Sequence, residues 1–389
     1  MFAKSVVGTV QGGMNYHVHR MRVIHLESGR HLYGGAQQVC DLMAGLAGHG
    51  IDNVLVCPRD SAIANQIGGM RKVAQVIEIP MGGELDFSLP ARLRTLLASR
   101  RPNLLHVHSR RGVDRFGGWN ARWAGVPAIL TRRVDSAEFK ALAHLKYKPY
   151  AAVIAISRAI EAQLKNNVGL PPHRVHYVAS GVDTDRYRPT ETRGRLAEVF
   201  GLSAGTVKIG VVAQLISRKG HEQLFSILPE LIAAQPNVEV LCFGQGPLQR
   251  ELEDQIRSLA LTGHVRLVGF RDDLIELLPE LDCLVHPARR EGLGVAVLEA
   301  LSCRVPVVIT AVGGLVDIVE HDVNGLLVAP DDDRALLAAL RRMVQQPVLR
   351  QRLGAAGRRR VEEAFSVDAM TRGNLAVYGQ VMKGDDDGS

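Results

Sequence analysis

The chain has 389 residues, of which 46% are hydrophobic and 22% charged, and its formal net charge is +7. This length exceeds the roughly 250–300 residues that one hydrophobic core supports, so we expect two domains. The composition is that of a soluble globular protein and argues against a disordered or fibrous chain. No apolar run approaches the roughly 18–20 residues of a spanning helix, which argues against an integral membrane protein.

The positive charge is concentrated in the first half of the chain. Residues 21–187 contain 22 Lys and Arg against 13 Asp and Glu, a net charge of +9, whereas residues 188–389 contain 23 against 27, a net charge of −4. A basic half fits an anionic membrane surface or a phosphorylated or lipid-linked acceptor, although a merely solvated basic face would give the same pattern. No nucleic-acid-binding module accompanies the charge, so we expect no nucleic-acid partner. We expect the acceptor to meet Arg110 and Arg111, and a surface patch further from the cleft to comprise Lys140, Lys146 and Lys148.

The N-terminal segment and the cysteines bear on processing and compartment. Residues 1–20 lack the uninterrupted apolar core of a signal peptide, so we interpret them as a disordered leader and Met21 as the natural start. The five cysteines are odd in number, widely spaced and without a C-x-x-C pair, which predicts buried, reduced side chains in the cytoplasm. They are Cys40, Cys57, Cys242, Cys283 and Cys303.

From Met21 onwards, strand-like runs alternate with helical patterns, which predicts parallel sheets covered by helices on both faces. The first half predicts strands at residues 23–26, 53–57, 76–79, 104–108, 128–131, 153–156 and 175–178, and helices at 36–48, 89–100, 115–124 and 157–167. The second half predicts strands at residues 207–212, 238–243, 265–268, 283–286, 305–309 and 325–328. Turn formers and a proline at residues 180–189 indicate a linker. The fold class is therefore α/β, with two doubly wound, Rossmann-like parallel-sheet domains whose strand carboxyl ends face each other across a cleft.

The segment REGLGVAVLEA at residues 290–300 is the most informative motif in the sequence. Gly292 and Gly294 allow close approach of a ligand, and the amides from Gly292 through Leu293 to Val295 would open a helix, a suitable site for a diphosphate. Beside them, the carboxylate of Glu291 can accept hydrogen bonds from sugar hydroxyls. Glu299 would lie about 12 Å further along the helix, near a ribose. A diphosphate with hydroxyl-rich groups on both sides is a nucleotide sugar.

Other polar and glycine residues also follow predicted strands. Gly34 and Gly35 come after the first strand and would let the backbone approach a phosphate or the acceptor. Arg218 and Lys219 follow the strand at 207–212, where cations would stabilise the negative charge that builds on a departing diphosphate. His108 ends the strand at 104–108, whereas a core role is the simpler interpretation of His106.

Together these motifs resemble the retaining glycosyltransferases of family 4, which have the GT-B fold; the resemblance covers roughly residues 21–382. It rests on the E-x7-E element and on the segments EALSC, PVV, GG and NGLLV that follow it. The resemblance implies an acceptor-binding domain at 21–182, a nucleotide-sugar-binding domain at 183–366, a helix at 367–382 that crosses back onto the first domain, and a polar tail at 383–389. It also implies that His108 touches the transferred sugar.

The resemblance further assigns two loops to the nucleotide. The turn with Gly244 and Gly246 would lie near the base, and backbone groups of Gly269, Phe270 and Arg271 would hold it. The family commonly has an arginine where this chain has Gln214, which leaves open whether Arg218 or Lys219 matters more. The resemblance also implies that no metal is essential. The D-x-D pattern at residues 183–185 lies in the linker, which disfavours a metal role for it, and Asp331, Asp332 and Asp333 have the form of a helix N-cap.

By this resemblance the chain is expected to transfer a sugar from a UDP- or GDP-sugar, with retention, to a glycolipid or saccharide acceptor in cell-surface polysaccharide, with lipopolysaccharide the leading pathway. It would need no cofactor and would be cytoplasmic or peripheral on the inner face of the membrane. A GT-B nucleotide-sugar epimerase is the alternative, and would turn over without an acceptor. A glycosidase is disfavoured because its two carboxylates should lie within about 10 Å of each other across the bond. A non-catalytic binding protein would bind the donor without turnover. The sequence does not identify the base, sugar, linkage or oligomeric state.

Overall fold

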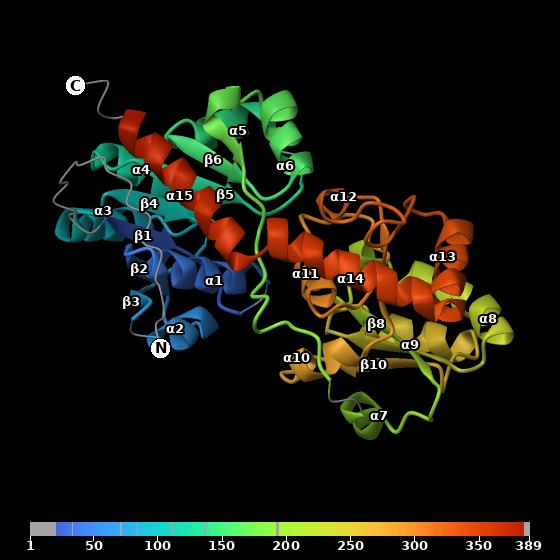
Figure 1. Cartoon of the computed structure of the whole chain (residues 1–389). Coiled ribbons are helices and arrows are strands. Elements are labelled where there is room, and N and C mark those ends of the chain that lie inside the picture. Colours follow the sequence, from blue (N-terminus) through green and yellow to red (C-terminus); the bar gives the residue numbers. More distant parts are fainter. Residues whose placement is uncertain are drawn as a thin grey trace, which may run out of the picture.

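The computed structural model describes residues 21–32, 34–70, 72–83, 85–109, 112–136, 138–191 and 194–384. Within these residues the chain forms two parallel sheets, each covered by helices (Figure 1). The leader predicted at residues 1–20, and Arg110 and Arg111, lie outside the described residues.

The first sheet has seven strands in the order β3-β2-β1-β4-β5-β6-β7. Its strands are β1 (Arg22–Leu26), β2 (Asp52–Pro58), β3 (Ala74–Ile79), β4 (Leu104–Val107), β5 (Ala128–Arg132), β6 (Ala152–Ala155) and β7 (Val175–Tyr177). The helices between them are α1 (Gly34–Gly48), α2 (Ala62–Gly68), α3 (Leu89–Arg100), α4 (Val113–Trp123), α5 (Lys140–Tyr147) and α6 (Arg158–Ala162).

The second sheet has six strands in the order β10-β9-β8-β11-β12-β13. They are β8 (Val207–Val212), β9 (Val238–Phe243), β10 (Val265–Gly269), β11 (Cys283–His286), β12 (Val307–Thr310) and β13 (Leu326–Val328). The α-helices of this half are α7 (Arg195–Phe200), α8 (His221–Ala234), α9 (Gln249–Ser258), α10 (Leu274–Leu277), α11 (Val295–Ser302), α12 (Leu315–Ile318), α13 (Asp333–Gln345) and α14 (Pro347–Ala364). The predicted doubly wound α/β fold is confirmed.

The strands form because their apolar runs are buried on both faces of each sheet. Every residue of β4, β6, β11 and β12 is buried, as expected for parallel sheets covered on both sides. The prediction missed α2, α5 and α7, which are too short to show a helical period. The helix predicted at 157–167 is α6 followed by a π-helical turn (Gln163–Val168), which ends at Gly169 with φ +80°.

The chain passes between the two halves at Val182 and again after α14. Val182 N donates to Phe365 O at 2.8 Å, and Val367 N donates to Val182 O at 3.1 Å. Helix α15 (Val367–Gly384) then lies over the first domain (Figure 1), where Tyr378 joins a buried cluster with Val23. The helix continues through Gly384, so the predicted tail begins later than residue 383. None of the described helices is both long and apolar enough to cross a membrane.

Strand order reverses between β1 and β4 in the first sheet and between β8 and β11 in the second. Ligands of such sheets bind beyond the carboxyl ends of the strands at this point. Contacts between the halves occur here: Arg290 Nη2 donates to Asp135 O at 3.1 Å, and Arg158 N donates to Asp317 Oδ2 at 2.7 Å. The fold thus brings two switch points together at one cleft.

Candidate active site

A cavity of about 330 Å³ lies in the cleft, between the loops after β1 and β5 and the start of α11. It contains most of the residues predicted to hold the donor. The predicted residues that line it are Gly34, Gly35, Arg218, Lys219, Glu291, Gly292, Leu293, Gly294 and Val295. Residues far apart in sequence therefore meet where a diphosphate was expected.

The N-terminus of α11 opens onto this cavity. Gly294 caps the helix with φ +102°, a left-handed conformation that favours glycine. A Cβ on Gly292 would lie 2.5 Å from Arg133 O, so only glycine permits this contact with the first domain. The eight-residue helix (Val295–Ser302) directs free amides and the positive end of its dipole toward the cavity.

Glu291 is bound by two side chains at the edge of the cavity. Its Oε2 accepts a hydrogen bond from His286 Nε2 at 2.8 Å and forms an ion pair with Lys219, while its Oε1 accepts from Gly292 N at 3.0 Å. Burial alone would raise the pKa of Glu291, but His286 and the charge of Lys219 hold it well below its usual range. Burial lowers the pKa of His286, so this ring is neutral and its Nε2 carries the donated hydrogen.

Lys219 and Arg218 differ in their surroundings. Both lie in a short 3-10 turn (Ser217–Lys219) that ends at Gly220, where a Cβ would lie 1.9 Å from Pro287 O. The Lys219 side chain is largely buried and ion-paired with Glu291, whereas Arg218 is exposed and donates only a long hydrogen bond, 3.5 Å, to Arg290 O. Lys219 is therefore held by an ion pair, whereas Arg218 has no ion-pair partner among the described residues.

Glu299 lies on the same helix as the diphosphate site but does not line the cavity. Burial raises its pKa to about 7, although a hydrogen bond from Tyr187 opposes the shift and Asp41 adds to it. Asp41 is itself affected, because burial raises its pKa to about 6. These two carboxyls, from different domains, therefore titrate close to neutral pH.

The residues predicted to hold the base also lie outside this cavity. Gly244 and Gly246 are glycine for packing reasons, since a Cβ on either would lie within 2.3 Å of a backbone oxygen in the loop after β8. Gly269 O accepts from Gly244 N at 2.8 Å, which joins the two loops. Phe270 is 60% exposed, and Arg271 forms a bidentate pair with Asp273 at 2.7 and 2.6 Å. The side chain of Arg271 is thus already occupied.

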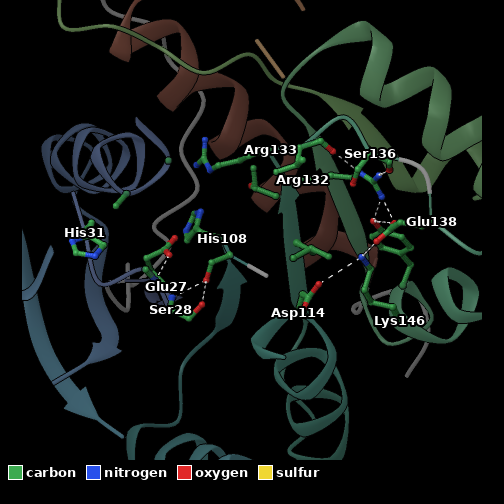
Figure 2. A pocket seen from close by; sticks show the side chains of 18 of the residues that line it. Glu27, Ser28, His31, His108, Asp114, Arg132, Arg133, Ser136, Glu138 and Lys146 are labelled. Atoms are coloured by element: carbon green, nitrogen blue, oxygen red, sulfur yellow. Dashed lines mark hydrogen bonds and ion pairs between the residues drawn. The ribbon is translucent and has the colours of Figure 1, made fainter. Parts of the chain in front are cut away.

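A second cavity, of about 480 Å³, is lined mainly by the first domain (Figure 2) and shares Arg133, Gln214 and Arg218 with the first cavity. Glu27, Ser28, His31 and His108 line one part of it. Its opposite wall contains a network of Arg132, Asp114, Glu138, Lys146 and Tyr147. The prediction that Lys146 belongs to a distant surface patch is wrong, because its side chain is 10% exposed and pairs with Glu138 within this cavity wall.

A chain of hydrogen bonds determines the protonation of His108. Asn53 Nδ2 donates to Met43 O and Val73 O, both at 3.0 Å, so Asn53 Oδ1 must accept from His25 Nε2 at 3.1 Å. His25 Nδ1 is then unprotonated and accepts from His108 Nε2 at 2.9 Å. His108 Nδ1, which has no partner among the described residues, therefore carries a lone pair. Burial lowers the pKa of His25 to about 4 and holds the pKa of His108 well below its usual range, so both rings are neutral.

His106 of β4, assigned to the core from the sequence, is fully buried, with side-chain partners on β5 and α15. Its Nδ1 lies 2.6 Å from Tyr378 Oη, and its Nε2 lies 2.6 Å from Thr131 Oγ1. His25, His106 and His108 are close enough together to be considered as metal ligands. The hydrogen bonds already account for both nitrogens of His25 and of His106, so the cluster fits a polar network.

Other predictions about acidic residues and cysteines are also answered by the described residues. Asp332 caps α13 and accepts from Ala335 N at 2.9 Å, as predicted. In the D-x-D pattern, Asp183 Oδ1 accepts from the backbone N–H groups of Asp185 and Arg186 and so forms a turn. All five cysteines are buried and unpaired.

The sequence interpretation missed three residues of this site: His286, Glu27 and Arg133. His286 is the last residue of β11, and Glu27 directly follows β1. Both therefore lie at the carboxyl ends of strands at the two switch points, and this position could have identified them from the sequence. Glu27 is 5% exposed, and burial raises its pKa although Gly29 N donates to it at 2.7 Å. Arg133 lines both cavities.

Comparison with known proteins identifies the family. The model described as "Glycosyltransferase Family 4" matches residues 33–186, and "Glycosyl transferases group 1" matches residues 194–360. A GDP-mannose-dependent alpha-(1-6)-phosphatidylinositol monomannoside mannosyltransferase of Mycolicibacterium smegmatis is 31% identical over 276 residues, covering 67% of this chain and 68% of the relative. The chain belongs to glycosyltransferase family 4.

Other glycosyltransferases share parts of this similarity. The lipopolysaccharide core biosynthesis mannosyltransferase LpsB of Rhizobium meliloti is 26% identical, over 79% of this chain and 92% of its own length. A GDP-mannose-dependent monoacylated alpha-(1-6)-phosphatidylinositol monomannoside mannosyltransferase of Corynebacterium glutamicum is 32% identical over 55% of this chain. The match spans only 58% of that relative's length.

Solved structures show the same fold. A glycosyltransferase from Rickettsia africae superposes with a TM-score of 0.83 at 18% identity, covering 94% of this chain and 99% of the other. Anabaena HepE in complex with UDP and glucose gives a TM-score of 0.81 at 19% identity, covering 93% and 100%. This family 4 glycosyltransferase therefore has the GT-B fold.

Proposed function

We propose that this glycosyltransferase moves a sugar from a nucleotide-sugar donor to a saccharide or glycolipid acceptor, with retention of anomeric configuration. The observation that carries the proposal is the cavity in which the α11 N-terminus, Lys219 and Glu291 meet. Amides and a cation suit the diphosphate, and an ionised carboxylate suits sugar hydroxyls. UDP with glucose in HepE and GDP-mannose dependence in two relatives support a UDP- or GDP-sugar.

In the proposed reaction the acceptor oxygen forms a bond to C1 of the sugar, and the bond from C1 to the phosphate oxygen breaks. The electron pair goes to the leaving phosphate, which takes the acceptor proton on the same face. Lys219 and the α11 amides stabilise this charge, with Arg218 free to join them. His108 Nδ1 can accept a hydrogen bond from a sugar hydroxyl. These groups need no essential metal, so EDTA should leave the rate unchanged.

The cavity of about 480 Å³ beside the donor site is the proposed acceptor site. Its presence supports transfer over epimerisation, because an epimerase needs no second substrate. The GDP-mannose-dependent relatives are named for lipid acceptors and LpsB for lipopolysaccharide core biosynthesis, which supports a lipid-linked acceptor and this pathway.

Helix α5, which borders this cavity, supports action at a membrane surface. Three large apolar side chains are exposed here: Phe139 (84%), Leu142 (61%) and Leu145 (57%). Exposed apolar surface is unfavourable in water, and insertion into a membrane interface would remove it from water. Lys140 and Lys148 flank them and form no ion pair among the described residues, so they suit anionic lipid. We propose peripheral binding to the cytoplasmic face of the membrane.

The test is a two-step assay with the full-length protein. UDP- and GDP-sugars are first screened for thermal stabilisation, and the donor found is then incubated with and without glycolipid acceptors. Transfer of sugar only when acceptor is present supports the proposal. Conversion of the donor without acceptor would establish the epimerase instead, and stabilisation without turnover under any condition would establish a binding protein.

A further inference from the structure

Two adjacent arginines at the end of β5 have opposite surroundings. Arg132 is fully partnered: its guanidinium pairs with Glu138 and donates to Tyr147 Oη at 2.6 Å and to Gln163 Oε1 at 2.9 Å. Arg133 has no carboxylate within ion-pair distance among the described residues. Its Nη1 donates to Ser180 Oγ at 3.2 Å, and its Nε is buried without any hydrogen-bond partner.

The acids nearest to Arg133 compensate its charge poorly. Glu27 and Asp41 influence the guanidinium only through space, and burial raises the pKa of both carboxyls. Burial also lowers the pKa of Arg133, to about 10. Arg133 is partly buried and has a single hydrogen bond among the described residues, so a bound anion would supply the partners that its guanidinium lacks.

Arg133 lies between the two cavities. It lines both of them, and Figure 2 shows its side chain extending from β5 toward His108. The backbone oxygen of Arg133 packs against Gly292, just before α11. The side chain of Arg133 lies close to Gly35, since a Cβ added there would be 3.8 Å from Arg133 Cδ. Lys219 lines the same donor cavity from the second domain. Gln214, which also lines both cavities, brings no charge.

We propose that Arg133 is a catalytic residue that binds a phosphoryl oxygen of the nucleoside diphosphate from the first domain. This inference rests on the proposed function. As the bond from C1 to the phosphate oxygen breaks and its electron pair passes to the phosphate, the unpaired guanidinium N–H groups stabilise the new charge. Diphosphate is thus held between a cation from each domain, and the donor itself draws the two domains together.

Calorimetry tests the proposal. It compares wild type, Arg133→Gln and Arg133→Lys in their binding of UDP, GDP and the corresponding monophosphates. Arg133→Gln should weaken diphosphate binding about 10–100-fold, the range of one charge-assisted hydrogen bond. Arg133→Lys should lose less, because it keeps the charge. Arg122→Gln, an exposed arginine of the same domain, is the matched control and should bind as wild type does. Binding of the monophosphates should not change, because they lack the β-phosphate on which the new charge forms.

Two further measurements separate this role from a structural one. Without ligand, Arg133→Gln should melt at or above the wild-type temperature, because a partly buried charge that has no ion-pair partner among the described residues is removed. Adding Gln214→Arg to Arg133→Gln should restore part of the diphosphate affinity, because Gln214 borders the same cavities.

The outcomes that overturn the proposal are distinct. If Arg133→Gln binds diphosphate normally and only raises the KM of the acceptor, the cation binds an anionic acceptor. Unchanged diphosphate binding and unchanged kinetics would show a structural residue. If no nucleoside diphosphate binds wild type, the proposed function itself fails.

Discussion

Glu291 is the residue on which the donor-site geometry depends most directly, since it contacts Lys219, His286 and an α11 amide. Glu291→Gln should lower kcat by about 10²–10³-fold, the usual effect of losing one such electrostatic contact. It should not weaken nucleoside diphosphate binding, because the neutral amide no longer forms an ion pair with Lys219 and so leaves Lys219 available to the phosphate. Calorimetry with UDP and GDP and steady-state kinetics measure both effects, and a kcat equal to that of wild type would refute the role.

Glu299 gives a pH dependence whose sign can be stated. Its pKa is raised from 4.5 to about 7, so its contribution to the free energy of unfolding is present below pH 4.5 and is lost as pH rises through 7. Glu299→Gln should therefore unfold less readily than wild type at pH 8, by roughly 2–3 kcal/mol at most, in chemical denaturation. At pH 4, below the unfolded pKa of 4.5, Glu299 is largely uncharged in both the folded and the unfolded state, so the two proteins should have similar stability.

The same carboxyl should affect donor binding in the opposite direction. If Glu299 binds the ribose, as the sequence predicts, its ionised form is the better acceptor for the hydroxyls, so the Kd for UDP or GDP should fall as pH rises from 6 to 8. This dependence should be much smaller in Glu299→Gln. An equal pH dependence in both proteins would assign the titration to another group, such as Asp41.

Single residues also show how far sequence reasoning reaches. Gly34, Gly35, Arg218, Lys219 and Glu291, singled out because they follow predicted strands or open a helix, do line one cavity, since parallel strands bring their carboxyl ends together. The residues predicted to hold the base, and Glu299, lie outside it. The partner of each charge could not be predicted. The Lys219–Glu291 pair, the Lys146–Glu138 pair and the isolation of Arg133 depend on packing between segments distant in sequence.

At the scale of elements, α5 carries the strongest expectation. Leu142→Gln combined with Leu145→Gln should reduce binding to vesicles that contain anionic lipid, because each exposed leucine removes apolar surface from water at the interface. Binding by wild type should weaken as salt rises, since exposed charges are screened over roughly 10 Å at 0.1 M. Vesicle co-sedimentation measures both.

The matched control for α5 is Leu85→Gln, another exposed leucine of the first domain, at 80% exposure. It should bind vesicles as wild type does. Equal loss in the control and in the α5 variant would mean that the whole basic domain, and not α5, meets the lipid. Donor binding in solution should be the same in all of these proteins.

Elements differed in how well the sequence predicted them. Strands in both halves were predicted because fully buried strands are continuous apolar runs. Short helices such as α5 have no long periodic pattern. The two leucines of α5 are exposed, which a pattern based on burial does not anticipate.

At the scale of the whole molecule, α15 fastens the second half of the chain to the first. On this helix, the buried Tyr378 hydroxyl forms a hydrogen bond with His106 of the first sheet. Tyr378→Phe should lower the free energy of unfolding by about 1–3 kcal/mol, because one His106 nitrogen is left unsatisfied. Chemical denaturation measures this, and wild-type stability in the variant would show that water replaces the hydroxyl.

The ion pair between Lys219 and Glu291 has a consequence for how the empty site discriminates among anions. Inorganic phosphate must separate Lys219 from its carboxylate and offers Glu291 only repulsion in return. A nucleotide sugar brings phosphate for the lysine and hydroxyls for the glutamate in the same molecule, so both groups exchange one partner for another. If the donor is a nucleotide sugar, as proposed, the site would require two chemical groups in one molecule, and we expect inorganic phosphate to be a poor competitor of the donor.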